Sequence, residues 1–197
     1  MESINFNAQT EEGRAMSEKV KSLYERAAKV LAVHCSVNKM AMGAMQSMGY
    51  NGFKRWHRYN SKCLFDCALK LANALFDKFR IKAEFKEYEL NYSPASMEEH
   101  LKAWEKALLD GMQELGSVQK EYCEQTGMRS EVVDCAIGMI AHDHEKACRY
   151  LKRFTESDWL ALDMHIVDDR LHDKYKQKED GNYGLWNNMM NYAMGKK

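Results

Sequence analysis

The chain of 197 residues contains a single proline, Pro94. A proline inside a helix removes a backbone hydrogen bond and clashes with the preceding turn, so long uninterrupted helices are possible on both sides of residue 94. The chain also has 14 methionines and only 11 glycines. This composition favours helices, because methionine is a good helix former and glycine a poor one. We therefore expect an all-α protein.

Apolar residues recur at helical spacing in several stretches of the sequence. Ser96 and Glu99 form a capping box at the start of one of them. A loop rich in methionine and glycine is expected at 39–51. The expected helices are Thr10–Asn38, Gly52–Phe79, a third from Ser96 to about Gly127, a fourth that starts after Ser130, and a short fifth from Asp158 to His172.

The stretch 81–96 alternates locally and closes on Pro94, which predicts an extended crossover between the second and third helices. The connections inside the two helix pairs are short, and short connections join antiparallel neighbours. A link of about fifteen residues lets the second and third helices run parallel. Four long helices with one long central crossover are the arrangement of a ferritin-like four-helix bundle.

The charges are balanced, with 29 basic and 29 acidic side chains, so we expect no nucleic-acid partner. No apolar run reaches the ~18–20 residues of a membrane span, and the first residues lack the pattern of a secretory signal. These observations predict a cytoplasmic protein without a membrane partner. We expect one domain over residues 1–172, the bundle with its short fifth helix, and a polar C-terminal extension at 173–197.

The residues themselves resemble ferritin. Residues 52–57, Gly-Phe-Lys-Arg-Trp-His, lead into 67–72, Cys-Ala-Leu-Lys-Leu-Ala, in a way that is similar to ferritin's second helix. Pro94 and the run 101–108 resemble the opening of its third helix, and 144–151 fits the fourth. The resemblance implies self-association into a hollow, symmetric shell, either alone or together with other ferritin subunits.

The resemblance also implies where a ferroxidase centre would lie. Two irons carry four to six positive charges. The serine, leucine, cysteine and glycine at the positions carried over from ferritin cannot neutralise them. We therefore expect a degenerate ferritin that is not an enzyme. Asp134 falls at the position that lines ferritin's three-fold pore. The ferroxidase positions carried over from the resemblance are Ser22, Leu64, Cys67, Gly111, Asp143 and His144.

The leading functional expectation is a catalytically silent subunit that needs no cofactor. It would build a structural or protective cage, as artemin does, or co-assemble with active subunits in the manner of a ferritin light chain. The alternative is an iron-storage ferritin that binds ferric iron and has a relocated ferroxidase site. A helical bundle that binds a small ligand in its core is the third possibility. The residues considered for the relocated site are Asp110, Asp143, His144 and Glu145.

His34, Cys67 and His144 all fall on helix faces that are expected to point inward. Two imidazoles and a thiolate suit zinc or copper better than a pair of irons. If the three side chains meet, the bundle holds a metal site that is unlike the ferritin centre. The other interpretation is that they are hydrogen-bonded residues of the core.

Overall fold

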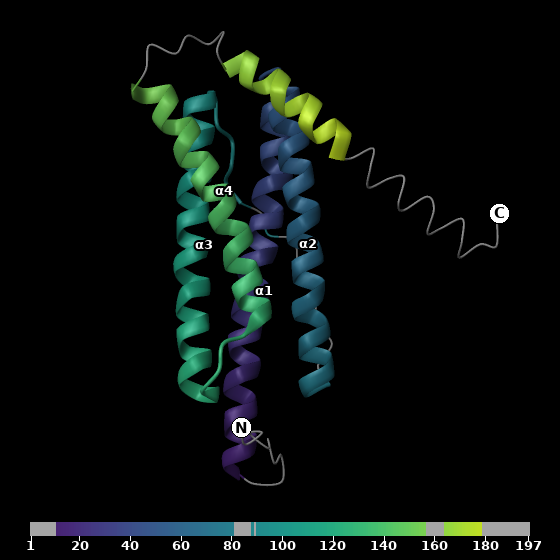
Figure 1. Ribbon diagram of the computed structural model, residues 1–197, viewed down its shortest axis with the longest axis vertical. Helices are drawn as coiled ribbons and strands as arrows, with labels where there is room; N and C mark the ends of the chain where they lie inside the picture. The colour runs from purple at the N-terminus through teal and green to yellow at the C-terminus, as the bar shows by residue number, and fades with distance from the viewer. Residues whose placement is uncertain (1–10, 81–87, 89, 157–163, 179–197) are drawn as a thin grey trace, which may run out of the picture.

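The computed structural model describes residues 11–80, 88, 90–156 and 164–178. Four long helices lie side by side, and a shorter helix at 164–178 crosses one end of them (Figure 1). The described part contains no strand, and none of its helices is long and apolar enough to cross a membrane. The four long helices are α1 (Glu11–Ser47), α2 (Asn51–Phe79), α3 (Met97–Thr126) and α4 (Glu131–Glu156).

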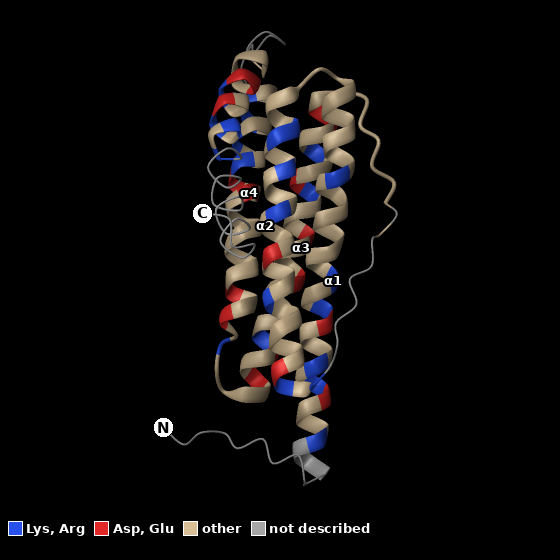
Figure 2. Ribbon diagram, turned by 90° about the vertical axis from the view of Figure 1, so that its right-hand side faces the viewer, with Lys and Arg blue, Asp and Glu red and all other residues tan. Residues whose placement is uncertain are grey.

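Two antiparallel hairpins make up the bundle. A turn at 48–50 joins α1 to α2, and residues 127–130 join α3 to α4. The described part of the crossover, 88 and 90–96, lies beside α1 (Figure 2), and the Tyr88 backbone N–H donates to Ser36 Oγ of α1 at 3.1 Å. The helices α2 and α3 run parallel (Figure 1). This confirms the predicted all-α, ferritin-like arrangement with a long central crossover.

The first helix is longer than predicted. It continues to Ser47, so the loop expected at 39–51 is wrong for most of its length. Methionine is a good helix former, and a glycine inside a helix costs only about 1 kcal/mol, so Gly43 does not end α1. Gly49 does mark its end, because its φ of 85° is one that glycine adopts readily.

The start of α3 follows the predicted capping box. The Glu99 backbone N–H donates to Ser96 Oγ at 3.2 Å, and the Glu99 carboxylate accepts from the Ala95 backbone N–H at 2.8 Å. The helix ends at Gly127, whose φ is 70°. A polar side chain and a glycine therefore fix both ends of α3, as the sequence indicates.

Substituting Ser96→Ala should lower the free energy of unfolding by about 1 kcal/mol, because the Glu99 N–H loses its acceptor. Urea unfolding followed by circular dichroism measures the change. Ser93→Ala, in the exposed part of the crossover, is the matched control. Equal losses in the two variants would contradict a capping role for Ser96.

Aromatic side chains cluster in the core near the starts of α2 and α3. Trp56 of α2 meets Trp104 of α3 edge to face, with ring centroids 4.6 Å apart. Phe53 and Tyr150 pack around Trp56, each 5.7 Å from it. Tyr175, from the helix at 164–178, stacks on Trp56 at 6.5 Å and is almost fully buried. The fifth helix thus contributes to the same core as the long helices.

A close backbone contact holds the fifth helix against α2. A Cβ added at Gly52 would lie 1.8 Å from the Asp168 backbone oxygen, so only glycine fits there. The Asp168 carboxylate also accepts from the Phe53 backbone N–H at 2.8 Å, which caps the start of α2 from another helix.

The fifth helix extends to residue 178, past the boundary expected at 172. Its expected start at Asp158 and the remainder of the expected extension, 179–197, lie outside the described residues.

Candidate metal site

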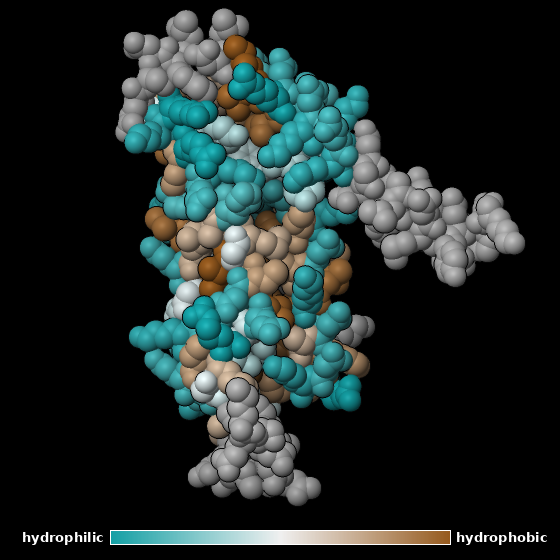
Figure 3. Space-filling model, viewed as in Figure 1, coloured by the Kyte–Doolittle hydropathy of each residue, from teal (hydrophilic) through white to brown (hydrophobic). Residues whose placement is uncertain are grey.

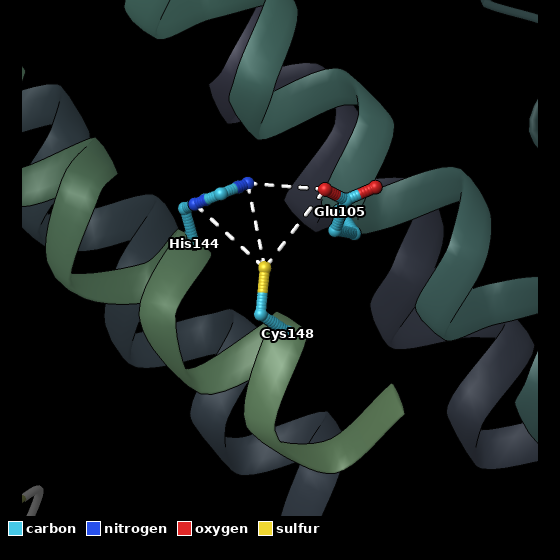
Figure 4. Close-up of side chains that lie close together, drawn as sticks. All are labelled: Glu105, His144 and Cys148. Carbon is cyan, nitrogen blue, oxygen red and sulfur yellow. Dashed lines mark hydrogen bonds and ion pairs between the residues drawn. The ribbon is translucent and has the colours of Figure 1, made fainter. Parts of the chain in front are cut away.

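Three metal-ligating side chains meet in the groove between α3 and α4 (Figure 4). His144 and Cys148 lie four residues apart on α4 and therefore share one face of that helix. Glu105 reaches them from α3. Among the described residues, these three form the one group of His, Cys, Asp or Glu whose ligand atoms all lie within 4.8 Å of one another.

The triangle of ligand atoms has the size that one metal ion requires. His144 Nε2 lies 3.1 Å from Glu105 Oε1 and 3.5 Å from Cys148 Sγ, and Sγ lies 3.9 Å from Oε1. Ordinary zinc bond lengths at tetrahedral angles place such atoms about 3.3–3.6 Å apart. Shifts of a few tenths of an ångström would therefore bring all three onto one ion. The remaining coordination positions are left for water or substrate.

The site is partly open to solvent and needs a proton to leave before it binds a cation. The His144 and Glu105 side chains are 20% and 26% exposed. Burial, and then the neighbouring Glu105 carboxylate, raise the pKa of the Cys148 thiol. At neutral pH the empty site therefore holds a protonated thiol. A metal ion must displace that proton, so its affinity should rise with pH.

Asp143, which precedes His144, points elsewhere. It is buried, and burial raises the pKa of its carboxyl group to about 6 despite the Lys146 ammonium 3.6 Å away. Consecutive helix residues point in different directions, so Asp143 and Glu145 do not join His144. Of the residues considered for a relocated centre, His144 alone belongs to the triad, while Asp110 lies on the far side of α3, facing the groove with α1.

His34, Cys67 and His144 lie in three different surroundings. The His34 ring lies against Gly111 of α3. Cys67 is buried beside Cys135 of α4; burial, followed by this second thiol, raises the pKa of Cys67. The structure does not bring the three ligand atoms within 4.8 Å of one another.

Two contacts give the register of α1 against α2. The Asn38 side chain meets His57, and the Cys35 thiol meets the Ser61 carbonyl oxygen. Leu64 of the core therefore lies at the level of about residue 32 of α1. Ser22 is about ten residues away, or about 15 Å along the helix axis. It does not face Leu64 across the bundle.

Asp134 is a partly buried residue in the first turn of α4, at the position where the resemblance places a pore lining. Its carboxylate accepts two hydrogen bonds from the Arg129 guanidinium, and this contact lowers the pKa of Asp134. The charge that would attract cations to a pore is thus largely neutralised within the chain. Its place in a pore stays a prediction.

Sequence reasoning missed a buried chain of hydrogen bonds that involves two histidines. His57 Nδ1 lies 2.8 Å from Asn38 Oδ1, and His57 Nε2 lies 3.1 Å from His100 Nε2. His100 Nδ1 lies 2.6 Å from the Tyr92 hydroxyl. With both rings neutral, every proton has an acceptor: Tyr92 donates to His100, His100 to His57, and His57 to Asn38. The signal available in the sequence was one histidine among the buried residues of each helix, His57 in α2 and His100 in α3.

Neither a protein-family model nor a curated protein matches this chain. Solved structures do match it. An open-pore ferritin from the hyperthermophilic archaeon Archaeoglobus fulgidus gives a TM-score of 0.58 at 11% identity, over 84% of this chain and 97% of that one. A closed form of the A. fulgidus ferritin, engineered by site-directed mutagenesis, gives 0.55 at 12% identity, over 80% and 94%. The chain therefore has a ferritin-like fold.

This comparison contradicts the prediction that the chain is not an enzyme. The chains that share the fold are ferritins, the family whose oxidising centre that prediction took to be lost. The prediction depended on the missing carboxylates at positions carried over from the resemblance. Absent ligands at the carried-over positions therefore do not show that an activity is absent.

Proposed function

We propose that this chain, with its ferritin-like fold, is a self-associating subunit that binds ferrous iron and oxidises it at a relocated site. The observation that carries the proposal is the triangle of Glu105, His144 and Cys148, whose size suits one metal ion. It supplies carboxylate, imidazole and thiolate ligands to a cation, at a site that is partly open to solvent.

Iron is the substrate of this site. Bound ferrous iron gives one electron to dioxygen, which becomes superoxide, and the iron becomes ferric. The Glu105 carboxylate and the Cys148 thiolate favour that change, because two anionic ligands stabilise the higher charge of ferric iron. His144 would supply a neutral ligand; its Nε2 lies 3.1 Å from the Glu105 carboxylate, and this contact gives way when Nε2 binds the ion.

Self-association is supported by apolar side chains that the single subunit leaves at its surface. Phe65, Leu69 and Phe76 are exposed along one side of α2. Apolar side chains reach the surface in the middle of the bundle, over α4 and along its flanks (Figure 3). Exposed apolar groups of this extent mark contacts with other chains. We propose that copies of this chain meet through such faces to form a hollow shell.

Metal-stripped protein should oxidise ferrous iron in air faster than buffer alone. His144→Ala and Glu105→Gln should each slow the initial rate at least about tenfold, because each removes a ligand of the reacting ion. The rate is followed by the absorbance of ferric iron, and sizing of the same sample reports the assembly. Stoichiometric zinc should inhibit, since the same three ligands suit zinc.

The matched control is His142→Ala, an exposed histidine two residues earlier on α4. It should leave the rate unchanged. A wild-type rate equal to that of buffer would overturn the oxidation, and unchanged rates in both ligand variants would overturn the site. A particle of the mass of one chain, 22.9 kDa, would overturn self-association.

A further inference from the structure

A groove of about 600 Å³ lies between α1 and α3, on a different face of α3 from the metal triad. Residues 90–92 of the crossover line one end of it. At the other end, Arg26 of α1 donates to the Glu114 carboxylate of α3 at 2.8 Å. The volume is within the range of sites for small organic molecules.

The groove exists because one face of α3 carries small residues. Ala103, Ala107 and Gly111 follow one another at intervals of four and so form one stripe. The facing stripe of α1 carries valines, at Val30, Val33 and Val37. The space between the two stripes is therefore mostly apolar, and its walls would contact a hydrocarbon well.

His34 puts a polar group at the base of this apolar groove. Its side chain is only 2% exposed, and its Nδ1 has no hydrogen-bond partner. A Cβ at Gly111 would lie 2.0 Å from Nε2, so the missing side chain of Gly111 gives the ring its place. An unpaired buried polar group destabilises the fold, and a ligand with a matching polar atom can recover that loss.

The residues that line the groove include three basic and two acidic side chains. Lys29 of α1 and Lys106 of α3 are exposed on its two sides, and Asp110 offsets one of them. The charge of Arg26 is neutralised by Glu114 and Glu121. The two lysine ammonium groups flank a groove whose base carries an imidazole that can donate one N–H.

We propose that this groove binds a small amphipathic carboxylate. The hydrocarbon part lies between the valines of α1 and the alanines of α3. The carboxylate accepts hydrogen bonds from the His34 imidazole and the Lys106 ammonium. The groove lies on a different face of α3 from the metal triad, so ligand binding in it does not require iron.

The test uses the full-length, metal-free protein and two probes of equal chain length, decanoate and decanol, in isothermal titration calorimetry. Decanoate should bind once per chain, and decanol at least about tenfold more weakly. Ala107→Leu, which fills the groove, should abolish the binding of both probes. His34→Leu should weaken decanoate about tenfold or more but leave decanol unchanged, since a lost charge-assisted hydrogen bond amounts to about that factor.

Ala141→Leu on α4, outside the groove, is the matched control for added volume and should bind both probes like the wild type. Circular dichroism confirms that His34→Leu is folded; removing an unpaired buried polar group should not destabilise the chain. No binding of decanoate below millimolar concentration would overturn the proposal. So would undiminished binding to Ala107→Leu, or decanol binding as tightly as decanoate.

Discussion

Lowering the pH from 7 to 5 is expected to destabilise this protein steeply, because three histidines are buried in their neutral form. Burial lowers the pKa of His100 to about 3 and that of His34 to about 4, and burial next to His100 puts the pKa of His57 well below its usual value. In the unfolded chain the same groups titrate near pH 6.5. Their contribution to stability is therefore complete above about pH 6.5.

Below that pH the unfolded chain binds more protons than the folded one. Each histidine then lowers the free energy of unfolding by up to about 1.4 kcal/mol per pH unit, until its own folded pKa is reached. Asp143 acts in the opposite direction between about pH 6 and 4, because burial raises the pKa of its carboxyl group to about 6. The net slope should be about 2–3 kcal/mol per pH unit near pH 5.

Urea unfolding at pH 7, 6 and 5 measures this slope. His34→Leu should reduce it by about one proton, or about 1.4 kcal/mol per pH unit. His172→Ala, a partly exposed histidine of the fifth helix, is the control and should retain the wild-type slope. A flat dependence between pH 7 and 5 would show that the buried histidines are not neutral in the folded protein.

Gly52→Ala is expected to cost about 3 kcal/mol or more of stability. The new Cβ would lie 1.8 Å from the Asp168 carbonyl oxygen and 2.7 Å from the His172 nitrogen, which are backbone atoms and cannot rotate away. Either α2 or the helix at 164–178 must move. That movement breaks the hydrogen bond from the Phe53 N–H to Asp168 and loosens Tyr175 from the core.

Gly43→Ala is the matched control, because it makes the same chemical change inside α1 with no atom within 4 Å of the added carbon. It should stabilise the protein by up to about 1 kcal/mol. Thermal unfolding of both variants against the wild type measures the difference. Similar melting temperatures for the two variants would exclude the close contact between α2 and the fifth helix.

Capping residues in the sequence predicted the helix ends at which they lie. Ser96 and Glu99 give the start of α3, and Gly127 gives its end, because caps act within one turn. The end of α1 was predicted too early, since the methionines after residue 39 read as a loop although methionine supports a helix. Where a glycine ends a helix depends on its φ, which distinguishes Gly49 from Gly43 and is not visible in the sequence.

The candidate site was predictable only in part. His144 and Cys148 are four residues apart, so their shared face follows from the sequence. Glu105 lies between Trp104 and Lys106 and looks like an ordinary surface residue of a helix. Its meeting with His144 depends on how far α3 is shifted along α4, and helical periodicity contains no information on that shift. The contact between His34 and Gly111 escaped prediction for the same reason.

The pairing of the helices also sets an order in which the chain can fold. The turn at 48–50 and the connection at 127–130 close short loops, so each hairpin can form with a small loss of chain entropy. Contacts between the two hairpins must instead close the long crossover, and such distant contacts form more slowly. The fifth helix docks on the start of α2, including Gly52, so this part of α2 must form before it. The architecture therefore favours a folding order in which the two hairpins form first and then join. Residues 164–178 dock last.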